Sequence, residues 1–210
     1  MADWFSWICL LTLLLGARMV IAHEFRHVRR GYVLQTGLVA LMYAWDSART
    51  GDILMWLALA GLVVIRLYLI PRLLTRILAR GTEPESTRRT LLNPSYALAL
   101  CALLAALGIG IGAAAGGPDS LPLGFALATL LAGLAMMVIR HEAPFQILGI
   151  LCADNGVDLL AGLTLTRIPA AGDYAVFIDV AVAASLLALL TLRLQTHGRD
   201  RVDEWNELRG

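Results

Sequence analysis

The sequence has 210 residues, of which 59% are hydrophobic and 16% are charged. This composition excludes an ordinary water-soluble domain, because globular proteins are about half apolar and the apolar residues here stand in blocks of about 20. The formal net charge of +1 gives no reason to expect nucleic-acid binding. We therefore expect an all-α, polytopic membrane protein.

Seven apolar blocks predict about seven transmembrane helices, since a helix needs about 20 apolar residues to cross the hydrocarbon of a bilayer. Turn sequences at 116–119 and 169–172 separate two pairs of blocks. In chain order the helices are expected at 4–22, 31–48, 52–71, 94–115, 120–139, 143–164 and 173–194. We divide the chain into a five-helix membrane region, 1–139, and a two-helix region with a tail, 140–210.

The positions of the arginines predict the orientation, because cytoplasmic loops carry an excess of basic residues. One set of connections and the tail hold Arg26, Arg29, Arg30, Arg72, Arg76, Arg80, Arg88, Arg89, Arg140, Arg199, Arg201 and Arg209. The alternate connections hold only Arg49 and Arg167. We expect the N-terminus outside and the C-terminus in the cytoplasm, with the chain in the cytoplasmic (inner) membrane. Arg18, Arg66 and Arg193 should lie near cytoplasmic helix ends and extend to the interface.

The third helix is expected to continue beyond the membrane. Arginines at 66, 72, 76 and 80 alternate with Leu and Ile, which is typical of an amphipathic helix on a membrane surface. Pro71 should kink or end the membrane-spanning part. The next two helices are rich in Gly and Ala, notably at 108–112, which predicts close helix packing in lipid.

Cysteines and histidines give no clear metal site. Cys9, Cys101 and Cys152 lie in apolar blocks and are interpreted as small core residues. His23, Glu24 and His27 have a spacing that hints at metal, but basic neighbours favour an interfacial patch or a partner contact. We expect no cofactor in this chain.

Acidic residues inside the predicted helices are the strongest functional signal. Asp154 should lie about 16 Å along the sixth helix, with Asp158 one turn further on the same face. Asn155 adds a polar group, and Asp179 lies about 9 Å from the outer end of the seventh helix, at a similar depth to Asp158. Intramembrane acids often relay protons, and burial favours their protonated form. The alternative is that these acids hold the helices together as protonated or hydrogen-bonded groups.

The last 70 or so residues resemble component E of hydrogenase-4. That family is related to subunit K (4L) of complex I and to the C component of multi-subunit sodium/proton antiporters. The resemblance rests on 147–149 and Asp154-Asn155-Gly156, and on 177–180, which contains Asp179. The C-terminal 207–210 is loosely similar to the end of subunit K. Asp154 stands where the hydrogenase family has Glu, Asp158 is an extra acid, and Ala183 stands where subunit K has a second Glu.

The resemblance implies a subunit that performs no chemistry alone. It would lie between quinone- or hydrogenase-side and antiporter-like membrane subunits, and contribute Asp154, Asp158, Asp179 and Asn155 to proton (or sodium) translocation. Metal clusters would belong to the partner subunits. Two alternatives stay open: an intramembrane metal-dependent transferase using paired aspartates, and a stand-alone transporter, although the sequence shows no convincing internal repeat.

Overall fold

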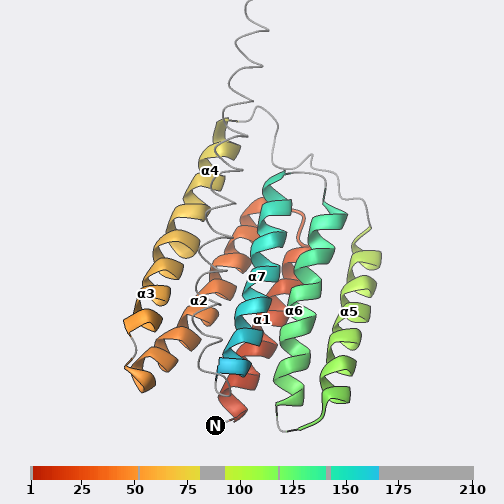
Figure 1. Ribbon diagram of the computed structural model, residues 1–210. Helices are drawn as coiled ribbons and strands as arrows, with labels where there is room; N and C mark the ends of the chain where they lie inside the picture. Colours follow the sequence, from red (N-terminus) through yellow and green to blue (C-terminus); the bar gives the residue numbers. More distant parts are fainter. Residues whose placement is uncertain (1, 52, 81–92, 118, 141–142, 166–210) are drawn as a thin grey trace, which may run out of the picture.

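A computed structural model describes residues 2–51, 53–80, 93–117, 119–140 and 143–165. These residues form a bundle of antiparallel helices without a strand (Figure 1). The all-α prediction is therefore confirmed for the described part of the chain. The seventh predicted helix, 173–194, lies outside it. In chain order the elements are α1 (Ala2–Ile21), α2 (Phe25–Thr50), α3 (Ile53–Gly61), the π-helix η1 (Leu62–Leu69), α4 (Ile70–Arg80), α5 (Pro94–Ala115), α6 (Ser120–Ile139) and α7 (Ala143–Leu165).

The bundle is built around α6, α7 and the first two helices. α6 packs against α1, α5 and α7, while α2 packs against α1, α7 and η1. The continuous helix α3–η1–α4 forms one edge of the bundle and α5 forms the other (Figure 1). The proposed boundary at residue 140 falls between α6 and α7, which pack directly against each other.

Among the residues that the structure describes, five helical segments are apolar enough, and long enough, to cross a membrane. They are α1, α5, α6, α7 and Met55–Arg76, which runs through α3, η1 and α4. α2 is longer but more polar, because it begins with arginines and buries Gln35, Thr36 and Ser47. Large apolar side chains such as Trp7, Leu103 and Val138 point outward. The bundle thus has an apolar exterior and a partly polar interior, as expected of a protein embedded in lipid.

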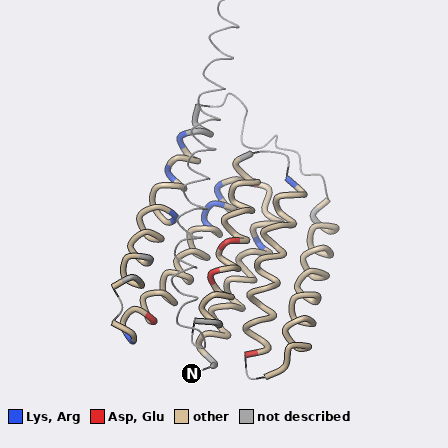
Figure 2. Tube along the Cα trace, in the orientation of Figure 1, with Lys and Arg blue, Asp and Glu red and all other residues tan. Residues whose placement is uncertain are grey.

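Basic residues gather at one end of the bundle, which we call the arginine-rich end (Figure 2). There α1 ends, α2 begins and α4 ends, so that Arg18, Arg26, Arg29, Arg30 and Arg76 lie near one another in depth. Arg49 lies at the other end, in the last turn of α2. The arginines thus gather at one end of the described helices and are sparse at the other, as their distribution between alternate connections predicts.

One predicted helix start and one predicted placement are wrong, for one shared reason. α2 begins at Phe25 instead of 31. The third helix continues past Pro71 to Arg80, as the sequence predicts, but this extension runs in line with the bundle instead of turning away along a membrane surface (Figure 1). Phe25 and Val28 belong to the same buried cluster as Ile70 and Leu74. Mutual burial of these apolar faces therefore starts α2 earlier than predicted and keeps the extension of the third helix in line with the bundle.

Close packing of α5 on α6 and of α6 on α7 depends on glycine, as predicted for the Gly-rich helices. A Cβ on Gly108 would lie 2.6 Å from the backbone nitrogen of Ala128. A Cβ on Gly156 of α7 would lie 2.6 Å from the nitrogen of Leu130 in α6. Backbones that approach this closely leave no room for a side chain.

Substitution of Gly156 by Ala should destabilise the bundle by about 1–3 kcal/mol, because the added methyl meets backbone atoms that cannot rotate away. Gly110→Ala is the matched control, since a Cβ there meets nothing within 4 Å. Thermal melting of the detergent-purified protein should show a lower Tm for Gly156→Ala only. Equal melting of both variants would contradict the close approach.

Candidate functional site: a buried arginine between two aspartates

The acids of α7 lie on its inward face, at the middle of the bundle. Asp154 is 7% exposed, Asp158 is 3% exposed and Asn155 is fully buried. The two aspartates lie one turn apart on the side of α7 that faces α2 and η1, and Asn155 lies next to Asp154 in the sequence. The sequence predicted this placement of Asp154 and Asp158 on one face, away from lipid.

The partner of these acids is Arg66, which sequence reasoning missed. One of its terminal nitrogens, Nη2, forms an ion pair with Asp154 Oδ2. The other, Nη1, lies 2.5 Å from Asp158 Oδ2 and 3.4 Å from Asn155 Oδ1. The guanidinium therefore bridges successive turns of α7 from a different helix.

The prediction that Arg66 extends to a cytoplasmic interface is wrong. Its side chain is 1% exposed. The physical reason is the length of the helix: the continuous segment runs from Ile53 to Arg80, so Arg66 lies at its middle and not at its end. The run of apolar residues on both sides of Arg66 was the available signal, because a cation surrounded by such residues requires a buried counter-charge.

Arg66 lies in a π-helical segment that precedes Pro71. The N–H of Ile70 donates to the carbonyl of Ile65, five residues back. In the same pattern the carbonyl of Arg66 would need an N–H from Pro71, which has none. The hydroxyl of Tyr32 in α2 donates to this carbonyl at 3.2 Å. The wider turn thus absorbs the proline without ending the helix, and it ties the backbone at Arg66 to α2.

Polar side chains of α2 complete the site, which we call the Arg66 cluster: Arg66, Asp154, Asp158, Asn155 and Tyr43. Tyr43 donates its hydroxyl to Asp158 Oδ1 at 3.3 Å. The amide of Asn155 donates to Gln35 Oε1 at 3.1 Å and to Thr36 Oγ1 at 3.2 Å. A connected set of hydrogen bonds therefore joins η1, α7 and α2.

Gln35 extends this network to a fourth helix, α1. Its Nε2 donates to the backbone carbonyl of Thr12 in α1 at 3.0 Å and to Cys152 Sγ at 3.3 Å. Cys152 is fully buried, and the other cysteines, Cys9 and Cys101, are also buried and unpaired with each other. Their interpretation as core residues is confirmed.

The formal charges of the cluster do not cancel. One guanidinium faces two carboxyl groups, so the fully ionised set carries one excess negative charge. A buried excess charge is expensive, and a single proton on either carboxyl removes it. A set of groups with this charge balance is able to bind one proton next to a fixed positive charge.

Asp179, the third predicted acid, lies outside the described residues. The structure therefore brings together Asp154, Asn155 and Asp158 of the predicted set, and adds Arg66 and Tyr43 to it.

Arg140, which the sequence places in a connection, is a second buried arginine. It is 1% exposed, and its Nη2 donates to the carbonyl of Val20 at 3.1 Å and to that of Ala22. These carbonyls end α1, where the helix dipole favours a cation. Its guanidinium also lies 4.9 Å from the ring centre of Phe145. Arg140 thus has a structural role that joins α1, α6 and α7.

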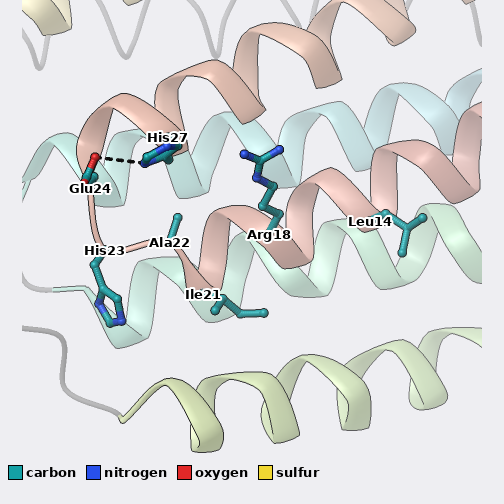
Figure 3. A pocket seen from close by; sticks show the side chains of 7 residues that line it. All are labelled: Leu14, Arg18, Ile21, Ala22, His23, Glu24 and His27. Atoms are coloured by element: carbon teal, nitrogen blue, oxygen red, sulfur yellow. Dashed lines mark ion pairs between the residues drawn. The ribbon is translucent and has the colours of Figure 1, made fainter.

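The histidine pair at the α1–α2 connection lines a pocket of about 560 Å³ (Figure 3). His27 Nδ1 lies 3.1 Å from Glu24 Oε2, whereas His23 extends from the other side of the connection, away from both. Within the described residues no group of three or more His, Cys, Asp or Glu side chains is arranged to hold a metal ion.

Comparisons with protein-family models, with curated proteins and with solved structures find no match to this chain.

Replacing Arg66 by Gln should destabilise the protein by about 3–5 kcal/mol, because it leaves two buried carboxyls without their cation. Arg76→Gln, at an exposed position of α4, is the control and should melt like the wild type. Adding Asp158→Asn to Arg66→Gln should recover part of the lost stability. Identical melting of the Arg66 and Arg76 variants would show that the ion pairs contribute nothing.

Proposed function

We propose that the chain is a non-catalytic membrane subunit of a complex I-related, energy-converting hydrogenase-type complex. In this proposal it contributes buried carboxylates to the coupling of proton (or sodium) translocation. The supporting observation is the Arg66 cluster, in which one buried cation is shared by Asp154 and Asp158. Helices α1 and α5–α7, with the segment Met55–Arg76, are compatible with membrane embedding.

The charge balance of the cluster supports proton handling. With one proton the set is neutral, and without it the set carries one negative charge. The free energy between these two states depends on nearby charge, because Coulomb interactions are strong where the effective dielectric constant is low. A change of charge in a neighbouring protein would therefore load or release the proton. Such a site can couple two events without performing chemistry itself.

The network around the cluster also supports a relay. Asn155 and Gln35 connect Arg66 to α1 through hydrogen bonds, and Tyr43 contacts Asp158 on the other side. The hydrogen bonds within such a network polarise one another, so that a change of protonation at one group alters the strength of the other hydrogen bonds. The same site also binds α7 to η1 and α2, and a purely structural role predicts different results in the experiments below.

The resemblance to hydrogenase-4 component E adds the proposed setting. It is carried partly by Asp154-Asn155-Gly156, and two of these three residues belong to the Arg66 cluster. We propose seven spans of the cytoplasmic (inner) membrane, with the N-terminus outside and the C-terminus in the cytoplasm. The proposed partners are antiporter-like and quinone- or hydrogenase-side membrane subunits, which would carry the metal clusters.

The alternative of a metal-dependent transferase has weaker support. Asp154 and Asp158 are spaced one turn apart, as a divalent cation site would require, but their carboxylates face the guanidinium of Arg66. A divalent ion would have to compete with that fixed cation for both ligands. A stand-alone transporter could use the same cluster, and reconstitution of the purified chain in liposomes distinguishes it from a subunit of a complex.

Substitution of Asp154 or Asp179 by Asn should leave assembly of the complex intact but reduce proton movement by about tenfold or more, because Asn cannot accept a proton at that position. Proton uptake by complex-containing liposomes, driven by the redox reaction, measures this with a pH-sensitive dye. Asp46→Asn, near the end of α2, is the matched control. Full pumping by the Asp154 and Asp179 variants would show that these acids are structural.

An affinity tag on the chain should co-purify antiporter-like membrane subunits in stoichiometric amounts from gently solubilised membranes. We expect this result because a subunit that relays protons needs neighbouring subunits to supply and receive them. Recovery of the chain alone, together with ion transport by it in liposomes, would favour the stand-alone transporter instead.

A further inference from the structure

A second pocket lies between α2 and the η1–α4 helix, at the arginine-rich end of the bundle. Its volume is about 540 Å³. It is separate from the Arg66 cluster, none of whose members lines it. We call it the α2–α4 groove; its lining residues are Arg29, Arg30, Val33, Leu34, Leu67, Tyr68, Pro71, Arg72 and Thr75.

The rim of this groove is strongly basic. It carries Arg29, Arg30 and Arg72, and no acidic side chain belongs to the described lining. Arg29 Nη1 donates to Thr75 Oγ1 at 2.5 Å, which joins the two helices across the groove. Arg72 lies over the ring of Tyr68 at 4.3 Å. A guanidinium has five N–H donors in a planar fork that matches a phosphate group, so these contacts leave donors available for an anion.

On both helices the charged lining residues lie nearer the end of the bundle than the apolar ones. On α2, Arg30 is followed one turn further into the bundle by Leu34. On the antiparallel partner, Arg72 is preceded by Tyr68 about one turn further in. One turn corresponds to about 5–6 Å. The groove is therefore cationic at the end of the bundle and apolar immediately below it.

The apolar part is open to the surroundings and not covered by other described helices. Leu34 and Tyr68 are each 57% exposed. An ion or a soluble polar metabolite would match the rim but not this apolar wall. A phospholipid matches both, because its phosphate and its acyl chains follow each other in the same order and over the same depth.

We propose that the α2–α4 groove binds one phospholipid with an anionic headgroup, from the leaflet at the arginine-rich end. The phosphate contacts Arg30 and Arg72, while an acyl chain packs along Leu34 and Leu67. This site does not depend on the proposed role of the Arg66 cluster. It identifies the edge formed by α2 and α4 as a surface that faces lipid.

Native mass spectrometry of the full chain tests the proposal in micelles that contain equal amounts of phosphatidylglycerol and phosphatidylcholine. The wild type should retain phosphatidylglycerol in preference to phosphatidylcholine. The double variant Arg30→Gln/Arg72→Gln should lose about fivefold in phosphatidylglycerol retention for each arginine removed, since a basic residue at the membrane surface contributes about 1 kcal/mol.

The matched control is Arg26→Gln/Arg76→Gln, which removes the same charge from the same two helices but from residues outside the groove. It should retain phosphatidylglycerol within about twofold of the wild type, because charges outside the site are screened. Circular dichroism melting verifies that both variants fold. Equal loss in the two double variants, or equal retention of both lipids by the wild type, would overturn the proposal.

Discussion

The ion pairs between Arg66 and the two aspartates of α7 impose the main constraint on this bundle. Burying three ionisable groups among apolar helices costs several kcal/mol for each ion, and removing the guanidinium leaves two carboxyl groups without a counter-charge. The surrounding chain offsets this cost with hydrogen bonds: Tyr43 donates to Asp158, and Asn155 accepts from Arg66. Asn155 in turn donates to Gln35. This explains why α2, which supplies most of these groups, is the most polar of the long helices.

Glycine makes the same site possible from the opposite face of α7. Gly156 directly follows Asn155, and its backbone lies against Leu130 of α6. Gly149 likewise approaches Gly133, with a virtual Cβ 3.0 Å from the Gly133 carbonyl oxygen. One face of α7 therefore carries ions and the other carries close backbone contacts. Because the backbone is fixed on one face, the carboxyl groups on the other are held at a constant depth.

Within the described residues, sequence patterns predicted the helices well, because apolar blocks of spanning length are unambiguous. They also predicted the inward acids, since Asp154 and Asp158 are four residues apart. They did not predict the cation, because a helix of expected span 52–71 places Arg66 near its end. The burial of Ile70 and Leu74 in one cluster with Phe25 and Val28 shows that the segment beyond Pro71 belongs to the bundle, so that Arg66 lies at the middle of the helix. Tertiary contacts, which no local pattern encodes, decided both the boundary and the partner.

The π-helical turn affects the direction in which the buried side chains of the third helix point. The buried residues Leu62, Arg66, Ile70 and Leu74 recur at intervals of four. In a regular α-helix such a stripe drifts by about 40° at each step, so it would spiral away from its neighbour. A wider turn rotates the stripe in the opposite sense over its first half, which offsets the drift of the α-helical half. The irregular backbone thus allows the side chains of Arg66, Leu62, Ile70 and Leu74 to face the same side of the helix.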